Sequence, residues 1–434
     1  RRELIKILQV RNIDSFVESR RQKTSEKDRK TVQAILNDVR KNGDSAVKKY
    51  ERKFNGKSTS QLRVSEKEIK EAFSKIISPK GYLTSFGFSW RALTLNGLWL
   101  KDQESFLREN LSRPIFVRNK SVSRKFVAIP SVGCYIPGGQ ARYPSSAVMS
   151  IIPAKVAGVK RIVAVSPPGR DGKIDPLTIA AAKWSGATEI YKVGGAQAIG
   201  ALAYGTKSIP KVDKIVGPGG KFVSIAKSLV SDQTAIDMIA GPTELGIIAD
   251  TSSDPELVAL DLISQAEHSK DTMCFVITQS KAMAKQIQRS LEKLIPGTER
   301  SSIIKKSISK NGFIAICKNE NEMVELANKV APEHLELMVK NAKSLSKKIT
   351  GAGLVLIGKY APSALSDYLT GTNHILPTNG FGRTRGGLSV LDFLKLQTSV
   401  QGRQGNPDPE GALKSITDAE DLPNHYKAVK RRWS

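Results

Sequence analysis

Long apolar segments, paired cysteines and histidine are all scarce in this chain. No apolar run approaches the roughly 18 residues of a membrane helix, and the first residues lack the apolar core of a signal peptide. Cys134, Cys274 and Cys317 form no C-x-x-C pair and no even disulfide framework. These absences argue against a thiolate zinc site, and we expect a cytoplasmic protein with no membrane partner.

Standard nucleotide-binding motifs are also missing. The sequence contains no G-x-G-x-x-G and no Walker A motif. The nearest features are VGGAQ at 193–197 and GPGG at 217–220, each of which follows a predicted strand and opens a predicted helix. Glycine there lets the backbone approach a phosphate, but it also occurs at such turns for packing alone. Both interpretations stay open at this point.

The charge balance is strongly basic. The 434 residues carry a net charge of +27, and residues 1–130 hold 30 Lys and Arg against 14 Asp and Glu. A nucleic-acid partner is one interpretation of this excess. Aromatic residues do not alternate with the basic ones, and no nucleic-acid motif is present. A solvated, lysine-rich surface is the interpretation we favour, with no specific nucleic-acid partner.

Length and periodicity predict an α/β protein with two Rossmann-like parallel-sheet domains. Short β-branched runs alternate with helical periods from about residue 124 onward, in two series at 130–242 and 245–360. The expected strands are 126–130, 161–166, 189–193, 214–217, 246–250, 273–278, 312–317 and 354–358. The expected helices between them are 175–186, 196–204, 221–230, 255–268, 281–294, 320–330 and 342–349. Ligands of such folds bind beyond the carboxyl ends of the strands.

Two of the four histidines suggest chemistry by their position. Asp254 can cap a helix that begins at Pro255, and this places Gln265 and His268 at i and i+3 on one helix face. Nitrogen and oxygen ligands at this spacing suit zinc, although the spacing also arises by chance. Asp367 and His425 are plausible further ligands.

The remaining histidines also stand beside polar residues. Glu333-His334 could transfer protons, because histidine titrates near neutral pH and a partly desolvated glutamate can act as a base. A capped helix end is the alternative for this pair. A short turn could bring Asp367 and His374 into one pocket, and Glu420 is the polar neighbour of His425 near the C-terminus.

Six motifs, taken together and in order, resemble histidinol dehydrogenases from about residue 30 to the C-terminus. They are CYIPGG at 134–139, VGGAQAI at 193–199, AGPTE at 240–244, SQAEH at 264–268, PEHL at 332–335 and GTNH at 371–374. The resemblance implies oxidation of L-histidinol through L-histidinaldehyde to L-histidine, with NAD+ and one Zn2+ per subunit. It also implies an intertwined homodimer with shared active sites.

The resemblance further suggests a division of the chain. We expect an N-terminal helical extension at 1–30 and a large zinc-carrying domain formed by 31–134 and 244–388. Residues 135–243 would form the NAD-binding domain. Residues 389–434 would form a C-terminal helical segment that completes the partner's site.

The resemblance also assigns roles residue by residue. The implied zinc ligands are Gln265, His268, Asp367 and, from the neighbouring chain, His425. His334 is the implied base for the hydroxyl proton, and Glu333 would activate the water that attacks the aldehyde. The substrate pocket would comprise Thr243, Gln265, His268, His334, Asp367, His374, Glu420 and His425. Tyr135, Gln197 and Gly220 would contact NAD+.

Two positions depart from the family pattern. Histidinol dehydrogenases usually have Ser where this chain has Thr243, and Asn where it has Gly220. The first change keeps the hydroxyl, whereas the second removes one side-chain contact to NAD+. A dehydrogenase of the same fold for another small polar alcohol, such as a sulfonated diol, is the main alternative. His374 and Glu420 favour a substrate that carries an imidazole.

Overall fold

The computed structural model describes residues 4–21, 25–56, 61–76, 85–111, 115–116, 122–138, 142–401 and 411–433. The chain divides into two compact units. Unit 1 comprises Arg1–Arg108 and Ala128–Leu394, and unit 2 comprises Glu109–Val127 and Lys395–Ser434. Within the described ranges, no helix is both long and apolar enough to cross a bilayer.

A five-stranded parallel sheet forms one half of unit 1, with the strand order β6-β5-β4-β7-β8. Its strands are β4 (Ser131–Tyr135), β5 (Arg161–Ser166), β6 (Glu189–Lys192), β7 (Lys214–Val216) and β8 (Ala235–Ile236). The accompanying helices are α6 (Pro144–Ala157), α7 (Pro176–Ser185), α8 (Gly195–Tyr204) and α9 (Lys221–Val230). Every residue of the central strand β4 is buried, as expected for a parallel sheet covered on both faces.

A six-stranded parallel sheet forms the other half, with the order β1-β11-β10-β9-β12-β13. Its strands are β1 (Lys6–Gln9), β9 (Glu244–Ala249), β10 (Met273–Thr278), β11 (Phe313–Ile316), β12 (His334–Met338) and β13 (Leu354–Ile357). Its helical segments are α10 (Pro255–Ala266), α11 (Lys281–Leu294), η1 (Ile295–Gly297), α12 (Ser301–Asn311), α13 (Glu320–Val330), α14 (Ala342–Ser346) and α15 (Ser363–Tyr368). The short helices η2 (Phe381–Arg383) and η3 (Val390–Phe393) follow.

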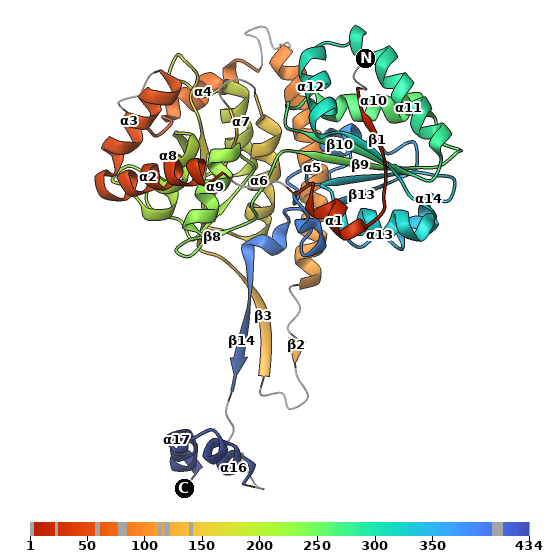
Figure 1. The fold of residues 1–434 in the computed structure, drawn as a ribbon. Coiled ribbons are helices and arrows are strands. Elements are labelled where there is room, and N and C mark those ends of the chain that lie inside the picture. Colours follow the sequence, from red (N-terminus) through yellow and green to blue (C-terminus); the bar gives the residue numbers. More distant parts are fainter. Residues whose placement is uncertain are drawn as a thin grey trace. The chain divides into compact units, whose positions relative to one another are not determined.

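The two sheets share one topology, and this confirms the predicted fold class (Figure 1). Apart from the edge strand β1, the earliest strand of each sheet, β4 or β9, lies in the middle. The next two strands are added on one side of it, and the last two on the other. The strand order therefore reverses between β4 and β7, and again between β9 and β12, which are the places where doubly wound sheets form crevices.

The N-terminal residues differ from the predicted helical extension at 1–30. They form strand β1, which pairs with β11 at the edge of the six-stranded sheet, followed by helix α1 (Ile13–Glu18). In Figure 1 the red strand β1 lies beside the green and blue strands of that sheet. The pairing partner of β1 is more than 300 residues away in the sequence, so local periodicity does not reveal this strand.

The expected assignment of residues 31–134 to the zinc-carrying domain stays a prediction, and part of this range packs against the other sheet. These residues include α2 (Glu26–Asn42), α3 (Asp44–Asn55), α4 (Glu66–Ser74), α5 (Ser85–Leu111) and β4. Apolar side chains of α2 and α3, such as Leu36 and Val47, share a core with Val163 and Ile199 of the five-stranded sheet and α8. The helices that precede the first sheet thus cover that sheet.

Unit 2 is smaller and departs from an all-helical C-terminal segment at 389–434. Strand β14 (Leu394–Val400) joins β3 (Val122–Ala128) and β2 (Ile115–Phe116) in a three-stranded sheet with the order β14-β3-β2. The two predicted C-terminal helices are present as α16 (Ala412–Ala419) and α17 (Pro423–Trp433).

Candidate active site

A hydrogen-bonded carboxyl group lies at the amino ends of β9 and β12. Thr243 precedes β9, and its hydroxyl donates to Glu333 Oε2. The Glu244 N–H donates to the same oxygen at 2.9 Å. Both bonds hold the carboxyl through Oε2, and Oε1 takes no part in either. Burial raises the pKa of Glu333, against the opposing effects of His334 and the Thr243 hydroxyl.

The Gln265 side chain extends this arrangement. Its Nε2 donates to Thr243 Oγ1 at 2.7 Å, and the residue is only 2% exposed. This bond fixes which end of the amide is nitrogen, so Oε1 faces the other way, where the Ser363 hydroxyl lies at 3.4 Å. A fixed amide oxygen of this kind can serve as a metal ligand.

His334, the first residue of β12, lies between two carboxyl groups. Its Nε2 is 3.6 Å from Asp367 Oδ1, and its Nδ1 is 3.8 Å from Glu333 Oε2. Nε2 is buried and has no hydrogen-bond partner among the described residues. Burial alone would lower the pKa of His334, but the adjacent Asp367 and Glu333 outweigh it and raise the pKa to about 9.

Helices α10 and α15 bring the remaining predicted side chains of unit 1 to the same place. Asp254 caps α10 and Pro255 opens it, as the sequence predicts, so Gln265 lies in its last turn and His268 just beyond its end. Asp367 lies on α15. Burial raises the pKa of Asp367, but His334, His374 and His268 lower it overall, which places three imidazoles within electrostatic reach of one carboxylate.

These side chains form a donor set with nitrogen and oxygen atoms that suits zinc. No cluster of three His, Cys, Asp or Glu residues arranged for a metal was found in the described ranges. Of the predicted zinc ligands in unit 1, just two, His268 and Asp367, belong to these residue types. The third is the amide of Gln265. The buried, unpaired His334 Nε2 next to Asp367 is consistent with a polar ligand at this place.

Glu420 and His425 belong to unit 2. Glu420 ends α16 as its C-cap, and His425 lies in the first turn of α17. Both are exposed in the single chain. Their predicted role requires the site of a second chain, and it stays a prediction.

The predicted cofactor residues lie at the other sheet. Tyr135 ends β4, and Gly217 directly follows β7, so both lie at the carboxyl edge where the strand order reverses. Lys227 and Asp237 form a buried ion pair, and both side chains hydrogen-bond to the backbone of Gly217. Lys227 Nζ donates to the Gly217 carbonyl at 2.9 Å, and the Gly217 N–H donates to Asp237 at 2.8 Å. This turn is therefore rigidly held beside Tyr135.

Gly220 caps α9 without any side-chain hydrogen bond. A Cβ atom built at this position would meet nothing within 4 Å. The space in which other family members are expected to hold an asparagine is thus open in this chain.

Two N–H groups of the turn at 193–197 are already hydrogen-bonded. The Gly194 N–H donates to the buried Glu51 carboxylate at 2.9 Å, and the Gly195 N–H donates to the Tyr135 hydroxyl at 3.0 Å. Glu51 also accepts from Gln197 Nε2 at 2.8 Å. An internal carboxylate therefore accepts an N–H at the start of α8, which favours the packing interpretation of this turn. Gln197 keeps one buried oxygen, Oε1, without a partner among the described residues.

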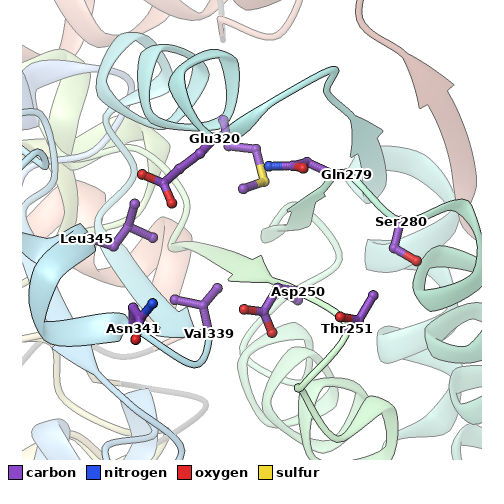
Figure 2. Close-up of a pocket in the computed structure, with 10 residues that line it drawn as sticks. Asp250, Thr251, Gln279, Ser280, Glu320, Val339, Asn341 and Leu345 are labelled. Atoms are coloured by element: carbon purple, nitrogen blue, oxygen red, sulfur yellow. The ribbon is translucent and has the colours of Figure 1, made fainter.

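Two cavities lie at the carboxyl ends of the sheets. One of about 320 Å³ adjoins β4 and β5, where Gly138, Ser166, Arg142 and Lys173 contribute to its wall. The other, of about 280 Å³, opens beyond β9 and β12 and is lined by Asp250, Asn341 and other residues shown in Figure 2. The second cavity lies at the opposite end of its strands from Thr243 and His334, so it is separate from the candidate active site.

Sequence reasoning missed several buried acids around the site. Glu244 accepts from the Asn379 N–H at 3.0 Å, and burial raises its pKa to about 8. Glu336 follows His334 by two residues and Asp261 precedes Gln265 by four. These spacings place Glu336 on the same strand face as His334, and Asp261 on the same helix face as Gln265. The spacing of these acids from predicted site residues could therefore have revealed them in the sequence.

Comparisons with known proteins point to one family. The family model described as histidinol dehydrogenase matches residues 18–433. Histidinol dehydrogenases of Methanococcus maripaludis and Methanocaldococcus jannaschii are 41% and 42% identical, and each alignment covers 93% of this chain and 92% of the relative. The crystal structure of histidinol dehydrogenase from Elizabethkingia anophelis matches with a TM-score of 0.89 at 31% identity, covering 100% of this chain and 98% of that one. The chain belongs to the histidinol dehydrogenase family.

Proposed function

We propose that this oxidoreductase converts L-histidinol through L-histidinaldehyde to L-histidine, with two NAD+ reduced per substrate. One observation carries the proposal: two groups able to exchange protons, Glu333 and His334, adjoin a nitrogen and oxygen donor set at the amino ends of β9 and β12. The family membership of the chain supports the choice of substrate. The same resemblance supports a homodimer in a cytoplasmic setting.

The donor set fits a zinc ion held by Gln265, His268, Asp367 and His425 of the partner subunit. When bound, zinc would supply the positive charge that holds the nitrogen atoms of the substrate. Thr243 supports the set because it accepts from Gln265 and donates to Glu333. His374, whose Nδ1 lies 3.4 Å from the Asp367 carbonyl, and Glu420 would complete the substrate pocket.

His334 and Glu333 would divide the proton transfers between the two oxidation steps. A zinc ion bound at Asp367 would offset the carboxylate charge that raises the pKa of His334 and so favour its neutral form. In the first step, neutral His334 takes the hydroxyl proton while the hydride of the same carbon leaves for NAD+. In the second, Glu333 Oε1 takes a proton from the water that attacks the aldehyde carbon. The hydrate then loses a second hydride to another NAD+. Tyr135, Gln197 and Gly220 would hold the cofactor.

The stoichiometry of the reaction tests the proposal. The purified chain, loaded with zinc, is given a known amount of L-histidinol and excess NAD+, and NADH and bound zinc are measured. We expect two NADH per histidinol and one zinc per subunit. Absence of NADH, or a single NADH per substrate, would overturn the proposed four-electron oxidation.

A further inference from the structure

A buried acid, Glu336, and a half-buried one, Asp261, lie next to the proposed zinc ligands. Glu336 is two residues beyond His334 on β12, so both side chains point to the same face of the strand. Asp261 is one turn before Gln265 on α10, on the same helix face. Each carboxyl group shifts the pKa of the other through a side-chain hydrogen bond, and Glu336 is only 1% exposed.

This contact requires a shared proton. Two ionised carboxylates can only accept hydrogen bonds. Glu336 Oε2 is buried, and no N–H or O–H among the described residues donates to it. Burial and the neighbouring Asp261 charge together raise the pKa of Glu336 to about 8. A neutral Glu336 that donates to ionised Asp261 therefore satisfies both groups near pH 7.

The other oxygen of Glu336 reaches a second helix. Its Oε1 accepts from the Ser363 N–H at 2.7 Å, and Ser363 is the first residue of α15. The Ser363 hydroxyl lies 3.4 Å from Gln265 Oε1. Asp367 follows Ser363 by four residues, on the same face of α15. Glu336 thus links, through its two oxygens, the two helices that carry Gln265 and Asp367.

We propose that Glu336, paired with Asp261, is a positioning residue that holds α10 and α15 so that Gln265 and Asp367 face one metal ion. This inference rests on the proposed zinc site. The role depends on hydrogen bonding and not on charge, because neutral Glu336 donates to one helix and accepts from the other. An apolar residue of similar size would leave the Ser363 N–H and Asp261 unpaired.

Two substitutions at Glu336 distinguish the effect of its hydrogen bonds on zinc affinity from the effects of its charge and packing. In Glu336→Gln the amide oxygen can accept from Ser363 and the NH2 can donate to Asp261, so we expect zinc affinity within about threefold of the wild type. In Glu336→Leu both bonds are lost, and we expect affinity to fall about 10- to 100-fold, as for other residues that orient metal ligands. Affinity is measured on the full chain by competition with a chromogenic zinc chelator, independently of activity.

Matched variants keep the result interpretable. Glu104→Leu removes another buried carboxyl, which accepts from the Val390 N–H, and should lower the melting temperature of the zinc-free protein while zinc affinity stays unchanged. Asp261→Leu breaks the pair from the α10 side and serves if Glu336→Leu does not fold; it should also weaken zinc binding.

The outcomes distinguish failure of the positioning role from failure of the proposed metal site. Unchanged zinc affinity in Glu336→Leu or Asp261→Leu, or a loss in Glu336→Gln as large as in Glu336→Leu, overturns the positioning role while the proposed function stands. Failure of the wild type to bind zinc overturns the proposed metal site and this inference together.

Discussion

His334 is the side chain whose chemistry the site shapes most strongly. It is buried between Asp367 and Glu333, and its Nε2 is left for a ligand. Asparagine has comparable polarity but cannot take a proton at this position. We expect His334→Asn to lower turnover by about 10²- to 10⁴-fold, the usual contribution of a general base. Bound zinc should remain at the wild-type level in elemental analysis, and full activity of the variant would refute the assignment of the base.

A substitution at Gly220 is expected to strengthen NAD+ binding. A side chain there enters open space, so Gly220→Asn should fold without strain. One added hydrogen bond to NAD+ contributes about 0.5–1.5 kcal/mol, which corresponds to a roughly 2- to 13-fold lower KM for NAD+. Asparagine could also cap α9, so the melting temperature is measured alongside. An unchanged KM with a higher melting temperature would show that the residue acts on the helix alone.

At the scale of elements, Glu104 joins the long helix α5 to the short helix η3. It is 7% exposed and accepts from the Val390 N–H. Burial raises the pKa of Glu104 to about 7 from an ordinary value of 4.5. The folded protein holds a proton that the unfolded chain releases near pH 4.5, so its stabilising effect is complete below that pH and is lost as pH rises to about 7.

Glu104→Gln removes this pH dependence, because glutamine keeps an oxygen for the Val390 N–H and does not titrate. Relative to the wild type, the free energy of unfolding of the variant should rise by about 3 kcal/mol between pH 4.5 and pH 8. Urea denaturation at both pH values measures the difference. A constant difference between variant and wild type would contradict the raised pKa.

Strands β4 and β12 were not predicted because each contains residues that are unusual in a central strand. β4 contains Gly133, which resembles a turn signal, but the Leu202 side chain comes within 2.8 Å of the place where a Cβ would lie. Glycine is there for close packing of α8 on the sheet. β12 carries His334 and Glu336 at buried positions, so its polar pattern conceals a central strand. By contrast, the start of α10 was predictable because its capping signals are local.

The same contrast applies to the whole site. The grouping of His268, Asp367 and His374 near His334 depends on the six-stranded sheet and on α15, neither of which local patterns specify. The family motifs supplied the residues, but not the hydrogen bonds among them. The Glu51 carboxylate at the start of α8 comes from a helix about 140 residues earlier, so a glycine turn alone could not reveal that its N–H groups are taken.

The proposed sharing of sites between two chains makes a prediction for the whole molecule. His268→Asn and His425→Asn should each be inactive, because each removes one proposed zinc ligand. If His425 completes the site of its partner, a mixed dimer has one site with both substitutions and one with neither. Random mixing of equal amounts after reversible dissociation should therefore restore about a quarter of the wild-type activity. If His425 serves its own chain, every site in the mixed dimer carries one substitution, and the mixture stays inactive. Re-associated His268→Asn alone is the control, and NADH formation from L-histidinol is the measurement that separates the two arrangements.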